Sequence, residues 1–295
     1  MKRFFQAILG SLSILMLVLF TLFIGIFVFL AILLRVLTPR SLRHKIASPV
    51  MVAVANFWIS ANLVWMKYVL RIDFHNENPV PLTMNQWSLV ISNHRSWVDI
   101  FALFAVFHRK IPILKFFIKK EMAKVPVVGQ AWWALDYPFM QRHSKSYLAK
   151  YPEKVNDDLK ATKKACEKFS LQPTSVVNFL EGTRFSEEKH GKTKSPYKNL
   201  LKPKAGGIAF TIQALGRKFS TVLDVTIAYG GQTPSFWDMA CGRVNKVRIH
   251  IQPTDVPEKF LEMDYRASSD MRVQFQEWLN ERWKLKDALL EQMAE

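Results

Sequence analysis

The residues of this chain best suited to chemistry are a histidine and an aspartate in the segment Ser92–Asp99, which follows an apolar run. The end of a strand before a helix is where α/β domains place reacting groups. A neutral His94 imidazole can accept a proton, and Asp99 can take the hydrogen of the other ring nitrogen and fix the tautomer. The pair suits general-base catalysis, although a helix-capping histidine beside an unrelated aspartate would show the same spacing.

A second polar segment, Glu181–Arg184, follows another strand-like run far along the sequence. Gly182 permits a tight turn at the strand end. Arg184 offers a planar fork suited to phosphate or carboxylate. Alone this segment could be an ordinary charged turn, but two such segments, each directly after a strand, favour one shared site.

The segments that surround these residues alternate between strand-like and helix-like patterns. This alternation predicts an α/β domain rather than an all-α bundle. Apolar and β-branched runs predict strands at Trp87–Ser92, Ala134–Met140, Ser175–Leu180, Thr221–Tyr229 and Lys246–Gln252. Helical spacing predicts helices at Asp99–His108, Ser144–Phe169, Lys204–Leu215 and Ser268–Met293, and Ser186–Lys202 reads as a loop.

The N-terminal part is predicted to anchor the chain in a membrane. Phe4–Leu34 contains no charged residue and exceeds the roughly 20 residues that cross a bilayer. Its length does not fit a secretory signal peptide. A second apolar stretch, 46–70, can be another span or an interfacial helix. We therefore divide the chain into an anchoring region, 1–70 (apolar helix 4–34 and second helix 46–70), and a catalytic domain, 71–295.

The sequence does not decide how many times the anchoring region crosses the membrane. Arg35, Arg40, Arg43 and Lys45 lie between the two apolar stretches, and positive-inside counting would hold them in the cytoplasm. A two-span hairpin with a cytoplasmic catalytic domain would place them outside. A single span followed by an interfacial helix, or a re-entrant hairpin within 4–34, would remove the conflict.

The net charge of the chain limits the classes of molecule that it is expected to bind. The formal net charge is +17, which suits anionic lipid headgroups or an anionic substrate. No nucleic-acid partner is expected, because the chain carries a membrane segment and no nucleic-acid-binding signature. Cys166 and Cys241 lie far apart, which indicates a reducing compartment and no disulfide framework.

The two polar segments together resemble the signature of a known family. Asn93-His94, separated by four residues from Asp99, together with Glu181-Gly182-Thr183-Arg184, resembles the signature pair of the glycerolipid acyltransferases, the 1-acylglycerol-3-phosphate (lysophosphatidic acid) acyltransferase family. The resemblance runs from His94 to about Tyr229. It includes Lys119–Glu121, Val125–Gly129 and a strand ending at Arg142. One segment departs from the family: Leu223–Ile227 lacks the proline of the usual valine-proline pair, which bears on acceptor identity.

The resemblance implies a glycerol-3-phosphate acyltransferase-like α/β domain, a mixed sheet flanked by helices and preceded by membrane helices. It implies that His94 is the general base and Asp99 its partner. The residues implied in substrate binding are Asn93, Lys120, Arg142, Glu181, Gly182, Thr183 and Arg184. The implied reaction moves a fatty acyl group from acyl-CoA or acyl carrier protein (ACP) to lysophosphatidic acid or another lysophospholipid. The implied location is the bacterial inner membrane, with the catalytic domain facing the cytoplasm.

No cofactor and no metal are expected, because the histidines lack metal-ligand spacing. A serine hydrolase is disfavoured because the chain contains no Gly-x-Ser-x-Gly. Gly191-Lys192-Thr193 imitates the end of a phosphate loop, but Ser186 stands where that loop requires glycine. The remaining alternative is a non-catalytic, basic, lipid-binding membrane-surface protein, which would have no need of the set His94, Asp99 and Arg184.

Overall fold

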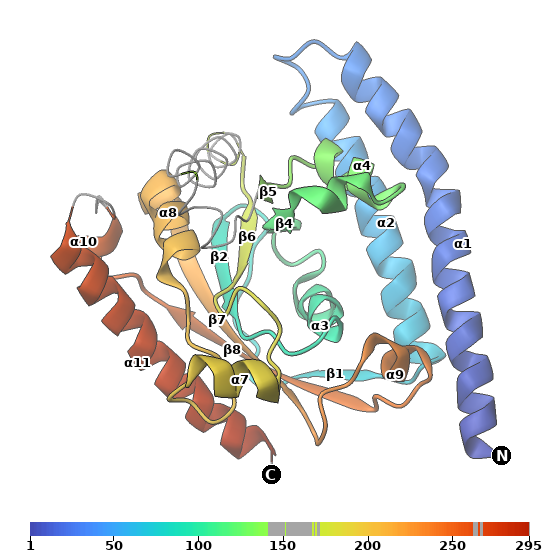
Figure 1. Ribbon diagram of the computed structural model, residues 1–295. Helices are drawn as coiled ribbons and strands as arrows, with labels where there is room; N and C mark the ends of the chain where they lie inside the picture. The colour runs from blue at the N-terminus through green and yellow to red at the C-terminus, as the bar shows by residue number, and fades with distance from the viewer. Residues whose placement is uncertain are drawn as a thin grey trace.

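A six-stranded mixed sheet forms the centre of the fold (Figure 1). The computed structural model describes residues 1–140, 151, 167, 169, 172–261, 265 and 268–294. The strand order is β1-β8-β7-β2-β6-β3, and only the β7–β8 pair among these strands is antiparallel. The strands are β1 (Asp73–Asn76), β2 (Trp87–Ser92), β3 (Leu114–Phe116), β6 (Ser175–Phe179), β7 (Phe219–Tyr229) and β8 (Lys246–Thr254). The short strands β4 (Ile118–Lys119) and β5 (Phe139–Met140) pair separately.

The central strand β2 is buried on both faces. Val90 packs into the core on one side of the sheet, whereas Leu89 and Ile91 pack into the core on the other. A nearly continuous apolar run is typical of a parallel strand covered by helices on both faces. This explains why Trp87–Ser92 could be assigned as a strand from its sequence.

Helices cover both faces of the sheet (Figure 1). Helix α3 (Val98–Phe107) packs on one face, and α8 (Ala205–Leu215) and α11 (Ser269–Ala294) pack on the other. The buried positions Phe275, Leu279 and Trp283 of α11 recur at helical spacing and form its apolar stripe. The shorter helical segments are η1 (Lys120–Lys124), α4 (Val128–Ala134), α7 (Glu187–Thr193), η3 (Gly216–Lys218), α9 (Phe236–Ala240) and α10 (Glu258–Leu261).

The N-terminal region is a hairpin of two helices, α1 (Lys2–Leu37) and α2 (Ala47–Tyr68), which lie side by side (Figure 1). Both are long and apolar enough to cross a membrane. Helix α1 is uninterrupted, so a re-entrant hairpin within 4–34 is wrong. The stretch contains no proline to break it.

Helix α1 contacts the rest of the chain near both of its ends. At one end, a side chain added to Gly10 would collide with Cys241 and Trp237 beside α9. At the other end, Arg35 forms a two-pronged hydrogen-bonded ion pair with Asp136, with distances of 2.9 and 3.0 Å. The hairpin therefore lies along one side of the α/β domain.

Most of the predicted elements are confirmed, with boundaries that differ by a few residues. The strand predicted at Ala134–Met140 is mostly wrong, because Ala134 ends α4 and Asp136 adopts a left-handed turn with φ 59°. The loop predicted at Ser186–Lys202 contains α7, whose first turn is capped by the Ser186 side chain. The helix predicted at Ser144–Phe169 lies almost wholly outside the described residues.

Candidate active site

Three neighbouring parallel strands bring distant residues to one edge of the sheet. Strand β2 lies between β6 and β7, parallel to both. His94 follows the end of β2, Glu181 follows the end of β6, and Tyr229 ends β7. Because parallel strands end at the same edge, these residues meet although they lie far apart in the sequence.

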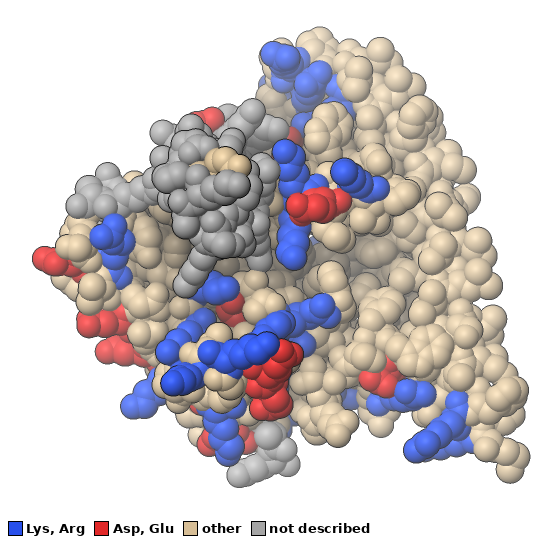
Figure 2. Space-filling view, viewed as in Figure 1, with Lys and Arg blue, Asp and Glu red and all other residues tan. Residues whose placement is uncertain are grey.

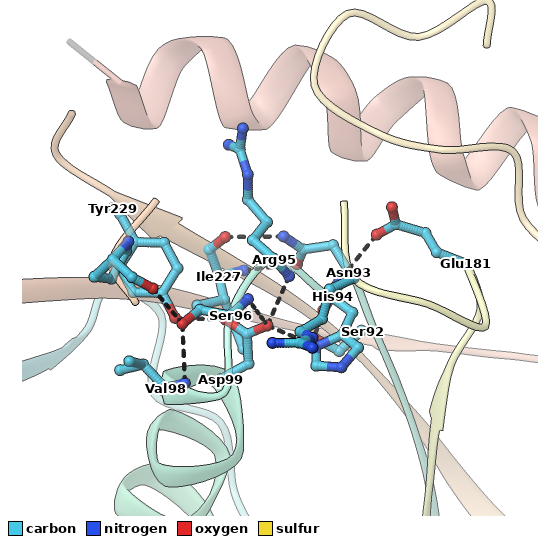
Figure 3. Close-up of polar contacts among 12 residues, drawn as sticks. Ser92, Asn93, His94, Arg95, Ser96, Val98, Asp99, Glu181, Ile227 and Tyr229 are labelled. Atoms are coloured by element: carbon cyan, nitrogen blue, oxygen red, sulfur yellow. Dashed lines mark hydrogen bonds and ion pairs between the residues drawn. The ribbon is translucent and has the colours of Figure 1, made fainter. Parts of the chain in front are cut away.

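His94 and Asp99 form a hydrogen-bonded pair (Figure 3). The distance between Nδ1 of His94 and Oδ2 of Asp99 is 2.8 Å. Asp99 lies in the first turn of α3 and is fully buried. The same carboxylate oxygen accepts the backbone N–H groups of Arg95 at 2.7 Å and Ser96 at 2.8 Å. The aspartate therefore orders both the imidazole and the turn that carries it.

This arrangement selects one tautomer of the imidazole. A carboxylate oxygen accepts hydrogen bonds, so Nδ1 carries the hydrogen and donates to Asp99. The lone pair is then on Nε2, which has no hydrogen-bond partner within the described part of the chain. The His94 side chain is 15% exposed. Its ring can thus accept a proton from a molecule that approaches from outside.

Aromatic rings hold the imidazole from the side. The ring of Phe179 stacks on His94 with a centroid distance of 4.0 Å and an interplanar angle of 14°. Phe116 stacks on Phe179 in turn, at 6.0 Å. The stacked ring of Phe179 covers one face of the imidazole.

Tyr229 completes the surroundings of Asp99. Its hydroxyl donates to Oδ1 of Asp99 (Figure 3). Burial raises the pKa of Tyr229 well above its usual value, and the Asp99 carboxylate raises it further. The hydroxyl therefore remains protonated and donates. Sequence analysis missed this residue, because a tyrosine at the end of a strand carries no motif. Only the position of β7 beside β2 indicates its role.

Glu181 lies close to His94 and bonds to main-chain groups. Its carboxylate is buried, and its two oxygens accept the backbone N–H groups of His94 at 2.8 Å and Leu201 at 3.0 Å. Burial raises the pKa of Glu181 to about 7, against the lowering effect of these two hydrogen bonds. Glu181 therefore holds the backbone on which His94 lies, and its role in substrate binding stays a prediction.

Asn93 likewise supports the site from inside. Its side-chain amide donates to the backbone oxygen of Ile227 and accepts from the N–H of Ile227, both at 2.9 Å. The residue is fully buried. Both ends of its amide join the end of β2 to β7, and its role in substrate binding stays a prediction.

The rest of the Glu181–Arg184 segment turns outward. Gly182 has φ +67°, the left-handed region that favours glycine. Thr183 Oγ1 accepts a hydrogen bond from Lys189 Nζ at 2.9 Å. Arg184 is exposed, and its guanidinium lies 4.9 Å from the ring centroid of Trp97. The next residue donates its N–H to the His94 carbonyl, so the arginine segment lies directly against the histidine segment.

The other predicted cationic contacts are less well placed. Lys120 is exposed at the start of η1, and the structure records no contact between it and the His94 segment. Arg142 lies outside the described residues. A cation that was not predicted, Arg95, follows His94 directly and places its guanidinium over the Phe185 ring at 5.0 Å.

An apolar pocket opens between α1, α2, α3 and α4. It is lined by residues that include Ile24, Met51, Phe104, Val127 and Trp132. An aromatic row connects it to the histidine: Phe104 meets Phe116 edge-to-face at 6.0 Å, and Phe116 leads through Phe179 to His94. The His94–Asp99 pair thus lies at one end of a row of aromatic side chains that leads to this pocket.

Comparison with known proteins places these features among acyltransferases. The family model "Acyltransferase" matches residues 71–230. The chain is 25% identical to the 2-acyl-1-lysophosphatidylinositol acyltransferase of Saccharomyces cerevisiae, over 69% of this chain and 60% of that protein. It is 23% identical to the 1-acyl-sn-glycerol-3-phosphate acyltransferase delta of Bos taurus, over 81% and 62%. The matches thus span about three fifths of the length of these relatives.

A solved structure has the same fold. The 1-acyl-sn-glycerophosphate acyltransferase PlsC from Thermotoga maritima matches 99% of this chain and 98% of its own, with a TM-score of 0.61 and 20% sequence identity. The match includes the N-terminal hairpin, since nearly the whole of both chains is covered.

Proposed function

The chain belongs to the acyltransferase family, and we propose that it moves a fatty acyl group from a thioester to the free hydroxyl of a lysophospholipid. The observation that carries this proposal is the His94–Asp99 pair, with Nδ1 bonded to the carboxylate and Nε2 open. An alcohol is a poor nucleophile at neutral pH, and a positioned neutral imidazole removes its proton as it attacks.

In the proposed reaction the acceptor hydroxyl gives its proton to Nε2 of His94 while its oxygen attacks the thioester carbonyl. The tetrahedral intermediate then collapses, the carbon–sulfur bond breaks, and the imidazolium returns the proton to the leaving sulfur. Asp99 stabilises the imidazolium in between. General-base assistance of this kind contributes roughly 10²–10⁴-fold. The thioester is already activated, so the reaction needs neither a metal nor a cofactor.

Lysophosphatidic acid is the acceptor we propose first. Arg184 is the exposed guanidinium of the Glu181–Arg184 segment, and guanidinium binds phosphate with two parallel hydrogen bonds. We propose that Arg142 and Lys120 add to this charge. Relatives named for lysophosphatidic acid and for lysophosphatidylinositol both match the chain, so remodelling of another lysophospholipid is the second candidate. Acyl-CoA and acyl-ACP are both proposed as donors.

We further propose that the hairpin lies in the membrane along one side of the domain. Gly10 and Arg35, which lie about 38 Å apart along a helix, both contact the domain. The hydrocarbon core is only about 30 Å thick, so a domain beside both ends cannot lie wholly outside a bilayer that α1 crosses. Figure 2 shows a nearly uncharged surface over α1 and α2, with Lys and Arg near its two ends.

In this placement α1 lies in the membrane without crossing it. Both of its ends are then on the cytoplasmic face, where thioesters are made. Single cysteines at Gln6 and at Arg40, in a chain whose two native cysteines are replaced by serine, should both react with a reagent applied from that side. Labelling of the two positions from opposite sides would contradict it.

The experiment that tests the function is acyl transfer from acyl-CoA and from acyl-ACP to lysophosphatidic acid by the purified chain. Wild type should form phosphatidic acid, and His94→Ala should lose at least about 10²-fold of the rate. Equal rates from both proteins, or no transfer by wild type to any lysophospholipid, would favour the non-catalytic lipid-binding alternative.

A further inference from the structure

The C-terminal helix α11 lies outside the region that the acyltransferase model matches, which ends at residue 230. It is nevertheless bound to the loop of residues 197–203 at several points. Asp287 accepts the backbone N–H groups of Lys198 and Asn199, both at 2.8 Å. Trp283 donates its indole N–H to the carbonyl of Leu201 at 2.9 Å. Figure 1 shows α11 running past this side of the domain.

The same loop holds the active site. Leu201 uses its carbonyl to accept from Trp283 and its N–H to donate to Glu181 Oε2 at 3.0 Å. The other oxygen of Glu181 accepts the N–H of His94 at 2.8 Å. Every intermediate group in this series is buried. Four residues, Trp283, Leu201, Glu181 and His94, thus form one continuous series of hydrogen bonds from α11 to the catalytic backbone.

A second connection reaches the site through the sheet. Lys286, one turn after Trp283, is 3% exposed and pairs with Asp224 of β7 at 2.5 Å. Its Nζ also donates to the carbonyl of Val225 at 2.6 Å and to Thr226 Oγ1 at 3.1 Å. The next residue of β7, Ile227, holds the side chain of Asn93. Helix α11 is therefore connected to the residues on both sides of the His94 peptide bond.

We propose that α11 is a positioning element of the active site, in which Trp283 acts through Leu201 and Glu181 on the backbone of His94. The inference rests on the proposed acyl transfer. A stripe of leucines would be enough to cover the sheet, whereas this stripe includes a tryptophan whose indole N–H reaches the Leu201 carbonyl and a lysine whose Nζ reaches the middle of β7.

The protonation of Glu181 gives this relay a recognisable signature. The ionised carboxylate accepts the two backbone N–H groups more strongly than the neutral acid does, and burial raises the pKa of Glu181 to about 7. The charged groups that face it are Asp99 of α3, Arg95 of the loop before α3, and Lys286 of α11. If Leu201 loses its anchor, Glu181 loses a donor to its charged form. Its pKa then rises.

The decisive variant is Trp283→Phe, which keeps an aromatic ring in the core and removes the indole N–H. The matched control is Trp278→Phe on the same helix. Trp278 packs on Phe260 and Phe275, and its indole N–H has no hydrogen-bond partner among the described residues. Both proteins should remain folded, as thermal melting in detergent will show.

Trp283→Phe should lower kcat up to about 10²-fold with little change in KM, because the acceptor site is intact and the base is misplaced. The acidic limb of its kcat profile should move to higher pH. Hydrogen exchange, followed by mass spectrometry, should increase in peptides that cover 197–203 and 92–96. Trp278→Phe should match wild type in all three measurements.

The exchange measurement separates failure of this inference from failure of the proposed function, because it requires no substrate. Unchanged exchange at 92–96 in Trp283→Phe would overturn the positioning role even if wild type is an active acyltransferase. If wild type shows no transfer while exchange rises as expected, the relay stands and the assigned reaction is wrong.

Discussion

Oδ2 of Asp99 lies 2.8 Å from Nδ1 of His94 and also accepts two backbone N–H groups from the turn between them. One oxygen thus fixes a side chain and the loop that carries it. The second oxygen is held by Tyr229 from another strand. The geometry of the His94–Asp99 pair therefore depends on the position of β7 as much as on the short motif itself.

Asp99→Asn tests whether the charge or only the shape of this residue matters. The asparagine oxygen can still accept from His94 and the turn, and its NH₂ can donate to the Tyr229 oxygen. The fold should persist, while the imidazolium loses its negative partner. We expect kcat to fall roughly 10²–10⁴-fold, measured at saturating thioester and acceptor. A variant within threefold of wild type would show that Asp99 has no electrostatic role.

Tyr229→Phe removes one donor from the Asp99 carboxylate. The carboxylate then keeps more of its negative charge for the imidazolium that forms during the reaction, so the acidic limb of kcat/KM should move to higher pH. Arg95, Glu181 and the turn amides remain around the pair and should leave the direction of this shift unchanged.

The control for this variant is Tyr137→Phe, which removes the buried phenol that donates to the Leu114 carbonyl. Both variants should lose about 1–3 kcal/mol of stability, since each leaves a buried acceptor without its donor. Only Tyr229→Phe should alter the pH profile. An identical profile for the two would refute the role of Tyr229.

Glu181→Gln isolates the effect of the buried carboxyl on stability. In the folded chain the pKa of Glu181 is about 7, compared with 4.5 for the free group. Between these values the unfolded chain has released the proton and the folded chain retains it, so stability falls as pH rises. The difference between these two pKa values corresponds to about 3 kcal/mol.

Measured as unfolding free energy in detergent, the difference between wild type and Glu181→Gln should therefore decrease by about 3 kcal/mol from pH 4.5 to pH 7. It should change little above pH 8. A difference that grows with pH over this interval would mean that the pKa of Glu181 is depressed rather than raised.

The sequence predicted the elements whose patterns are long or strongly apolar. Trp87–Ser92 reads as a buried strand because both of its faces are covered, and Ser269–Ala294 has a clear helical period. The strand predicted at Ala134–Met140 is mostly wrong because a short apolar run fits a strand and a helix end equally well. The left-handed turn is at Asp136 and not at a glycine, although Pro138, two residues later, is typical of the chain just after a helix end.

The candidate site was predicted where side chains face each other and missed where they face the backbone. His94 and Asp99 were paired from their spacing together with the family resemblance, and the structure confirms that the two side chains meet. Asn93 and Glu181 were expected to meet a substrate, yet their partners are main-chain groups of Ile227, Leu201 and His94. The type of a residue does not reveal that its partner is a main-chain group. Tyr229 was missed for the same reason, since its role follows from strand order.

Gly182→Ala tests the left-handed turn at the end of β6. The alanine would be held at φ +67°, and its Cβ would lie 3.1 Å from Lys204 Nζ, so the lysine must move. We expect a loss of about 1–2 kcal/mol in stability. A reduced rate should accompany it, because Glu181 and Arg184 flank the turn. Gly191→Ala is the control: it lies in α7 with nothing within 4 Å of the added Cβ. It should stabilise the chain by about 0.4–1 kcal/mol.

The buried pair of Lys286 and Asp224 is the remaining test, and it concerns the segment that departs from the family. Strand β7 is hydrogen-bonded to β2 on one side and β8 on the other. A proline in this stretch would remove a ladder hydrogen bond. Here the stretch carries Asp224 instead, whose charge is matched by a lysine from α11.

Burial lowers the pKa of Lys286, and the Asp224 carboxylate opposes that effect. Lys286→Met should therefore leave an unpaired buried carboxylate and cost about 3–5 kcal/mol, with a cost of the same order for Asp224→Asn. The double variant removes both charges and should recover much of that loss, because two buried charges cost desolvation energy that their attraction only partly offsets. Unfolding in detergent of wild type, both single variants and the double variant gives the coupling energy directly. Additive losses would show that the two charges do not interact, and the connection of α11 to β7 would then depend on the bonds of Lys286 to Val225 and Thr226 alone.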